Sequence, residues 1–276
     1  MDKFYHLSAC NFYFIYIFYF IVILFLIFFF ILGSAIGSFL NVVIDRTVRR
    51  ETLLGRSYCD NCHATLGTVD LIPIFSFVGL GGRCRVCKKP VSWQYPIVEA
   101  IAGILFVISF LAQSAAGNLT IASLLFNFFL VSILIIVATV DLKFSLIPTS
   151  FVYMASLVAL AYNFIFLNHN LFIQNVFAAF AAAFFFGLIV FVTRGKGMGT
   201  GDITLAFLMG LVLGFFQMVL AVFLAFFFGA LVSVFLIILG KKHFGQTIPF
   251  APFLVLGFLI ALFWGGPLLA WYLMVY

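Results

Sequence analysis

The stretch Gly199-Thr200-Gly201-Asp202 joins a basic turn to the long apolar run 203–239. Beyond Glu99 the chain contains only two acidic residues, Asp141 and Asp202. An ionisable side chain inside a membrane or at its edge is energetically costly, so a chain that keeps one generally uses it. The isolation of these two carboxylates in apolar sequence predicts that they work as a pair.

The composition excludes a soluble globular domain. Of the 276 residues, 66% are hydrophobic and 8% are charged, and the mean hydropathy is +1.30. Because a transmembrane helix needs about 20 apolar residues, the chain can hold several such helices but no large soluble domain. The net charge of +6 does not indicate nucleic-acid binding, because the basic residues after Lys3 are confined to 46–89, 143, 194–196 and 241–242. These segments share one side of the membrane if each intervening run crosses twice, and the positive-inside rule makes that side cytoplasmic.

Breaks in the apolar sequence predict an all-α polytopic membrane protein with about eight transmembrane helices. The run 203–239 would be about 55 Å long as one helix, so we expect two helices that turn near Gly214–Gln217. The predicted divisions are an N-terminal transmembrane helix within 1–41, a cytoplasmic loop domain over 42–96, and a transmembrane domain over 97–276 that contains Asp141 and Asp202. The predicted spans are 12–32, two within 97–140 that separate near Gln113–Asn118, two within 151–192 that separate at Asn168–Asn170, two within 203–239, and 252–275.

This topology places Asp141 and Asp202 at cytoplasmic helix ends, at one depth. Two neighbouring carboxylates do not both ionise easily, so one keeps a proton. The ionised group can then activate water while the protonated group polarises a peptide carbonyl, which is the chemistry of an aspartic peptidase. Nearby glycine permits close approach of a substrate strand, and proline holds a loop in non-helical form. The residues expected to shape these loops are Gly199, Gly201, Pro148 and Pro249.

The residues leave two other roles open for the carboxylates. They could serve a proton- or metal-coupled transporter, or each could cap a helix N-terminus or pair with a cation such as Lys143 or Lys196. A transporter is expected to place its binding groups near the middle of the membrane, in broken helices. The predicted position at helix ends favours a peptidase.

The loop 42–96 carries eight of the fourteen basic residues and four of the five cysteines. Cys59 and Cys62 form one CxxC pair, and Cys84 and Cys87 form a second. This spacing is typical of a structural zinc site with four thiolates, and stable disulfides are rare in the cytoplasm. Metal binding would supply folding free energy to a segment too small for its own core. Redox chemistry and free thiols are the alternatives.

Several motifs occur in an order that resembles the type IV prepilin peptidases, which are bifunctional leader peptidases and N-methyltransferases. The resemblance covers nearly the whole chain after the first helix. Its elements are Gly37-Ser38-Phe39-Leu40-Asn41-Val42-Val43-Ile44, the two CxxC pairs, Gly82-Arg83-Cys84-Arg85, Tyr95-Pro96-Ile97-Val98-Glu99, Asp141 with Ile147-Pro148, the GxGD motif of Gly199–Asp202, and Ile248-Pro249-Phe250.

The resemblance implies that Asp141 and Asp202 are the catalytic dyad of an enzyme in the bacterial inner membrane. Its substrates would be prepilins of type IV pili or pseudopilins of type II secretion systems. Family members cut after the Gly that ends a short basic leader, on the cytoplasmic side. They then methylate the new N-terminal residue, usually Phe, with S-adenosylmethionine as the methyl donor.

Five positions depart from the common family pattern without removing a catalytic carboxylate. They are Thr47-Val48 in place of Leu-Pro, Thr149 in place of Asp, Thr204 in place of Lys, and Ala251 in place of Gly. No glycine-rich fingerprint in 42–96 indicates S-adenosylmethionine, so the residues of the methyl-donor pocket are unknown. The methyltransferase prediction depends on the resemblance, together with the retained cysteines and Glu99.

Overall fold

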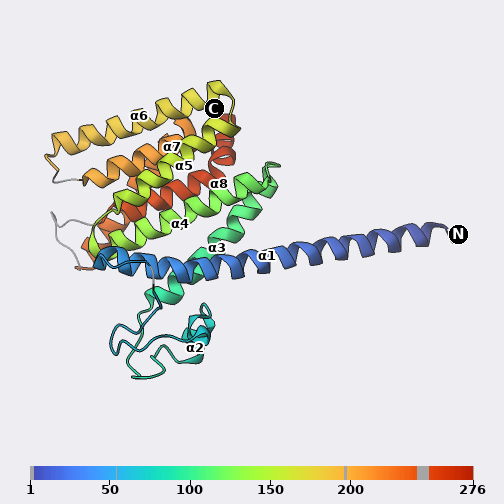
Figure 1. Ribbon diagram of the computed structural model, residues 1–276. Coiled ribbons are helices and arrows are strands. Elements are labelled where there is room, and N and C mark those ends of the chain that lie inside the picture. Colours follow the sequence, from blue (N-terminus) through green and yellow to red (C-terminus); the bar gives the residue numbers. More distant parts are fainter. Residues whose placement is uncertain (1–2, 54, 196–197, 241–248, 276) are drawn as a thin grey trace. The chain divides into compact units, whose positions relative to one another are not determined.

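The structure is a computed structural model that describes residues 3–53, 55–195, 198–240 and 249–275, with side chains described from Phe20 to Met274. Lys196 and Ile248, both named above, lie outside these ranges. The described chain is almost entirely helical, and its only strand-like pairings are two isolated bridges. The helices in Figure 1 are α1 (Lys3–Arg49), the 3₁₀ helix η1 (Thr68–Leu71), α2 (Phe75–Gly79), α3 (Gln94–Ala115), α4 (Ile121–Phe144), α5 (Thr149–Phe166), α6 (His169–Val192), α7 (Thr200–Ile238) and α8 (Ala251–Val275).

Seven of these helices in the described chain are long and apolar enough to cross a membrane, which confirms the predicted polytopic all-α fold. The chain is therefore a multi-pass membrane protein. Most predicted breaks fall where helices end. The connections between α3 and α4, between α4 and α5, and between α5 and α6 contain the predicted polar or proline residues.

Residues form two compact units, one of Met1–Asn41 with Gly55–Leu111 and the other of Val42–Leu54 with Ala112–Tyr276. In the first unit, the small residues of α1 pack on α3. A Cβ added to Gly33 would lie 2.7 Å from the Ala102 carbonyl oxygen, and one added to Gly37 would lie 2.8 Å from the Glu99 Cα. The backbones approach too closely for any larger side chain, as small-residue faces allow in membranes.

The helix α1 continues to Arg49, well beyond the expected loop boundary at residue 42. No glycine or proline interrupts it after Ser38, and its end is capped by side-chain bonds within the second unit. The Arg46 guanidinium donates to the carbonyls of Thr52 (3.2 Å) and Leu53 (2.8 Å). Arg50 then adopts a left-handed φ of 57°, which ends the helix.

The second unit is a helical bundle in which α7 lies between α6 and α8 (Figure 1). The first part of α7 runs antiparallel to α6, because Phe207 contacts Phe180 and a Cβ on Gly210 would meet Ala179. If α7 were straight, Phe226 would lie about 24 Å beyond Gly210, toward the N-terminal end of α6. Instead, the Phe226 ring stacks on Phe186, farther back along α6 (6.2 Å between centroids). The helix α7 therefore reverses direction.

The reversal occurs at Gly214, whose φ of 69° and ψ of −179° are not helical. Few residues other than glycine adopt this conformation. The break removes a helical partner from the Leu211 carbonyl, and the Asn163 amide of α5 donates to that oxygen at 2.6 Å. The expected turn near Gly214–Gln217 is thus present, and seven membrane helices make eight traverses. The first arm, Thr200–Leu213, is only about 21 Å long, which is short for a core of about 30 Å.

Candidate active site and metal site

Asp141 lies in the last turn of α4 and is 5% exposed. Its Oδ2 accepts a hydrogen bond from the backbone N–H of Ala251 at 3.1 Å. Ala251 is the first residue of α8, where backbone N–H groups have no partner within the helix. The carboxylate therefore caps α8 and is held in place by it.

Asp202 lies in the first turn of α7 and is also 5% exposed. Its Oδ2 accepts a hydrogen bond from the backbone N–H of Gly199 at 3.0 Å, so it caps its own helix. Its Oδ1 is buried without a hydrogen-bond partner among the described residues. A buried carboxylate oxygen without a partner is costly, and this oxygen keeps its full capacity to accept a hydrogen bond.

The two motifs meet because Gly201 has no side chain. A Cβ at Gly201 would lie 2.6 Å from the Ile147 Cβ, so Ile147 occupies the space that a larger residue would need. Pro148 follows as the N-cap of α5, and Pro249 precedes α8. Gly199, by contrast, has an ordinary φ of −82°, and a Cβ there would meet only ordinary contacts, the nearest with Asp202 Oδ2 at 3.7 Å. At Gly201, the residue that makes the close approach is therefore Ile147 of the same chain.

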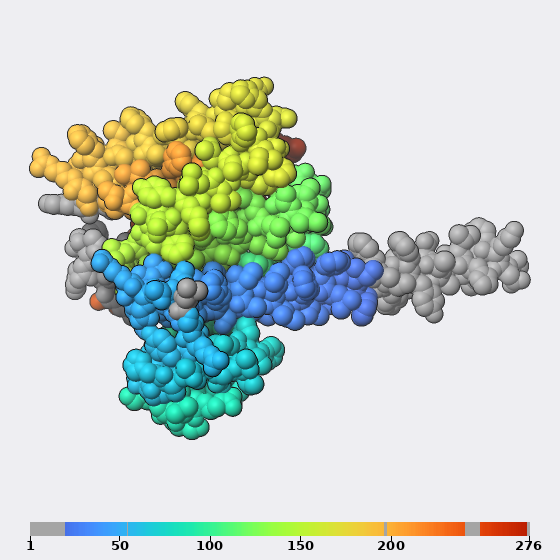
Figure 2. Space-filling view, viewed as in Figure 1, coloured from blue at the N-terminus to red at the C-terminus, as the bar shows by residue number. Residues whose placement is uncertain are grey.

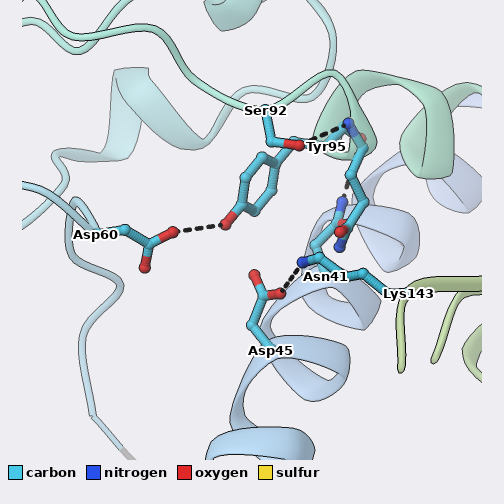
Figure 3. Close-up of polar contacts among 7 residues, drawn as sticks. Asn41, Asp45, Asp60, Ser92, Tyr95 and Lys143 are labelled. Atoms are coloured by element: carbon cyan, nitrogen blue, oxygen red, sulfur yellow. Dashed lines mark hydrogen bonds and ion pairs between the residues drawn. The ribbon is translucent and has the colours of Figure 1, made fainter. Parts of the chain in front are cut away.

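Asp141 and Asp202 are close enough to interact electrostatically. Within the described chain, neither carboxylate forms an ion pair with a lysine or arginine. Lys143, considered above as a partner of Asp141, instead binds Asp45 at 3.0 Å (Figure 3). The helix-capping role considered above is present, and it uses one oxygen of each carboxylate. The arrangement leaves two buried, mutually interacting carboxyl groups that no lysine or arginine of the described chain neutralises.

The four cysteines predicted to bind metal converge in the loop. All four sulfur atoms lie within 4.8 Å of one another, and the sulfurs of Cys59 and Cys87 are 3.9 Å apart. A tetrahedral zinc site with Zn–S distances of about 2.3 Å has sulfur–sulfur edges of about 3.8 Å. The donor set and its spacing therefore fit zinc.

Each CxxC pair forms a turn of the same construction. In the first, the N–H of His63 donates to the Cys59 carbonyl at 2.9 Å, and the N–H of Cys59 donates to Ala64 at 3.0 Å. The second repeats these bonds with Lys88, Cys84 and Lys89 at 3.0 and 2.9 Å. His63 and Lys88, which follow the second cysteine of each pair, are both left-handed (φ 54° and 58°). We call these two turns the cysteine knuckles.

The environment separates the pKa values of the thiols. Hydrogen bonds from the backbone N–H groups of Cys87 and Val86 lower the pKa of Cys84 to about 6. The backbone at Ala64 acts to lower the pKa of Cys62, but desolvation and the other three sulfurs raise it to about 11. Crowded thiols of this kind resist complete ionisation, and a cation bound among them would relieve the repulsion.

A polar network not expected from the sequence ties the first knuckle to the start of α3 (Figure 3). The hydroxyl of Tyr95 donates to Asp60, between Cys59 and Cys62, at 3.4 Å. The Asn41 amide donates to the Tyr95 carbonyl at 3.1 Å and accepts from Gln94 at 3.3 Å. Asn41 and Tyr95 both belong to motifs quoted above. They are 54 positions apart, and no local sequence pattern indicates that they form a hydrogen bond.

Comparisons with known proteins agree with this arrangement. Residues 31–113 match the bacterial peptidase A24 N-terminal domain, and residues 128–234 match the type IV leader peptidase family. The chain is 30% identical to a prepilin leader peptidase/N-methyltransferase of Aeromonas hydrophila (88% of this chain, 92% of the relative). It is 31% identical to one of Bacillus subtilis strain 168 (88% and 96%) and 29% identical to one of Pseudomonas aeruginosa (88% and 91%). No solved structure matches.

These matches cover both units, so the chain belongs to the prepilin leader peptidase/N-methyltransferase family. It is accordingly a membrane peptidase and N-methyltransferase.

Proposed function

We propose that Asp141 and Asp202 form the catalytic dyad that cleaves the leader from type IV prepilins or type II secretion pseudopilins. One observation carries the proposal: the two acidic residues beyond Glu99 interact with each other, are buried, and form no ion pair with a cation among the described residues. Each uses one oxygen to hold a backbone N–H. The names of the relatives support the substrate class.

The dyad works with one carboxyl ionised and one protonated. The ionised group takes a proton from water, and the resulting hydroxide adds to the scissile carbonyl carbon. The protonated group gives its proton to the carbonyl oxygen. When the tetrahedral intermediate collapses, the C–N bond breaks and the leaving amine takes a proton from the protonated carboxyl. The ionised carboxyl takes a proton back from a hydroxyl of the intermediate, which restores the singly protonated dyad. The unpaired Oδ1 of Asp202 is suited to bind the water or the carbonyl.

Cleavage takes place after the Gly that ends the leader, at the cytoplasmic face of the membrane. A basic leader stays in the cytoplasm while the apolar helix of the substrate enters the bilayer. The scissile bond then reaches the depth of the two carboxylates. The peptidase domain comprises 97–276, following the N-terminal helix within 1–41 and the loop domain 42–96.

The second activity transfers a methyl group from S-adenosylmethionine to the new N-terminal amine, usually of Phe. Family membership supports this activity, and we assign no residue to the methyl-donor pocket. Zinc held by the two cysteine knuckles is structural, because four thiolates would leave no coordination position open for catalysis.

The test uses purified protein in detergent with a synthetic prepilin that carries a basic leader, then Gly, then Phe. Mass spectrometry follows leader loss and the methyl mass shift, with and without S-adenosylmethionine. We expect wild type to cut after Gly, and Asp141→Asn and Asp202→Asn to be folded but at least about 10³-fold slower, because each removes an essential acid or base. If both variants cut as fast as wild type, the two carboxylates are not catalytic and serve only as helix caps. Both variants should still methylate a peptide that has already been cleaved, which is detected as a mass increase of 14 Da.

A further inference from the structure

The loop contains an uncharged apolar segment, Leu71–Leu80, that the function proposed above does not use. It lies between Asp70 and Arg83, and its sequence is LIPIFSFVGL. Asp70 binds Arg85 at 2.7 Å, so the two ends of the segment are tied together. In Figure 2 the loop residues gather into one lobe.

The side chains of this segment do not form a core. Phe75 is 77% exposed and Val78 is 71% exposed, and these positions share one face of α2. Val69, Leu71 and Ile72 are exposed beside them. Exposed apolar side chains that cluster in this way mark an interaction surface.

Contacts with α3 determine the depth of the segment. Trp93 immediately precedes α3, a membrane span, and tryptophan at such a position lies at the headgroup level. The Phe77 ring contacts Trp93 with 4.9 Å between centroids. The N–H of Ile74 donates to Glu99 at 2.7 Å, and Glu99 lies about 7.5 Å into α3 from Gln94. At that level α3 already presents Ile97, which is 50% exposed, to the bilayer.

Several backbone N–H groups of the segment have partners within the protein, as an apolar medium requires. Bonds inside the segment satisfy the N–H groups of Phe75, Ser76, Val78 and Leu80, and Pro73 has none. Ile74 has a left-handed φ of 63°, which is rare for a β-branched residue. Its N–H has the Glu99 carboxylate as its acceptor.

We propose that Leu71–Leu80 is a membrane-inserted anchor of the cysteine loop, with Phe75 and Val78 in contact with lipid acyl chains. The occupant of this surface is the bilayer because the segment continues the lipid-facing surface of α3 at the same depth. The anchor would hold the cysteine knuckles against the membrane face. The proposal does not depend on the proposed peptidase chemistry.

The experiment compares a fluorescent amino acid at position 78 with one at position 86, in full-length protein in lipid nanodiscs. Val78 and Val86 are matched in residue type and in exposure (71% and 67%), but Val86 lies among charged residues of the second knuckle. The nanodiscs contain lipids with a nitroxide on the upper acyl chain. We expect position 78 to be quenched at least threefold more than position 86, with emission shifted to the blue.

A variant tests the depth mechanism. Glu99→Leu removes the acceptor of the Ile74 N–H and should reduce quenching at position 78 at least twofold, whereas Glu99→Gln keeps an acceptor oxygen and should retain it. Equal lipid quenching at positions 78 and 86, in protein that elutes as a single species with native helix content, overturns the proposal. Quenching at position 78 by a nitroxide-labelled prepilin helix but not by lipid would also overturn it, and would assign this surface to the substrate.

Discussion

The contact between Gly201 and Ile147 joins the two halves of the candidate active site. Asp202 follows Gly201 directly, and Ile147 lies in the loop after Asp141. Only a hydrogen atom fits at Gly201, because a Cβ would approach the Ile147 Cβ to 2.6 Å. The separation of the two carboxylates therefore depends on this glycine.

We predict that Gly201→Ala lowers the rate of leader cleavage by about 10²-fold, because displacing a catalytic group by about 1 Å has an effect of that size. The rate is measured with the synthetic prepilin described above. The matched control is Gly199→Ala, where the added Cβ would be 3.7 Å from the nearest atom, Asp202 Oδ2, an ordinary contact. We expect the control to remain within about threefold of wild type. Equal rates for the two variants would show that the Ile147 contact does not position Asp202.

The reversal of α7 depends on a second element, α5. Gly214 breaks the helix, and the Asn163 amide of α5 takes the place of the missing backbone partner of Leu211. The first arm of α7 can therefore end inside the bundle without an unpaired carbonyl at that position. This bond links the position of Asp202, at the other end of the arm, to the packing of α5.

We predict that Asn163→Leu destabilises the protein by about 1 kcal/mol, a size typical of interhelical hydrogen bonds in membranes. Reversible unfolding in mixed detergent measures the change. The control is Ser109→Ala, because the Ser109 hydroxyl donates to Leu105 in its own helix (2.7 Å) and that carbonyl also has a backbone partner. A loss of stability no greater than that of the control would mean that the Leu211 carbonyl is satisfied in another way.

The cysteine knuckles lead to a pH prediction for metal binding. The pKa of Cys62 is raised to about 11, so this thiol is protonated near neutral pH and a metal must displace its proton. Since metal binding releases at least one proton, its affinity should rise at least about tenfold per pH unit between pH 6 and 8. Competition with a chelator, followed by the absorption of bound cobalt(II), measures this dependence.

Cys62→Ser serves as the control, and it should lose the tetrahedral thiolate spectrum. An affinity that does not change with pH would show that all four thiols are already ionised without metal. The pKa of Cys84, lowered to about 6, implies that this thiolate is the first to be available to the metal.

For the molecule as a whole, the reversal of α7 decides the topology. If α7 crossed once, the connections before and after it would lie on opposite sides of the membrane. With two arms they lie on the same side. The positive-inside rule then agrees with the structure, because basic residues flank the run 203–239 at both ends.

We predict that reporters fused after Gly195 and after Gly240 both have cytoplasmic activity, while a reporter fused after Asn168 has periplasmic activity. Paired green fluorescent protein and alkaline phosphatase fusions measure the two sides. A periplasmic signal after Gly240, with a cytoplasmic signal after Gly195, would mean that α7 crosses the membrane as a single helix.

Much of this architecture could be predicted from local patterns. Apolar runs of sufficient length must be helices in a membrane, because backbone groups have no other partners there. Polar and proline breaks therefore located most helix ends, and the spacing of the CxxC pairs predicted the cluster that the structure contains. The scarcity of acidic residues beyond Glu99 identifies Asp141 and Asp202 as candidates from the sequence alone.

Other features depend on contacts between residues distant in the chain, for which no local pattern exists. Only the tertiary structure brings the Ala251 N–H to Asp141, the Asn163 amide to Leu211, and the Ile74 N–H to Glu99. The end of α1 at Arg49 was missed for the same reason, because Arg46 stabilises it through carbonyls of the following chain. Burial and hydropathy act on each residue separately and are visible in sequence, whereas hydrogen bonds and close backbone approach are properties of pairs and require the fold.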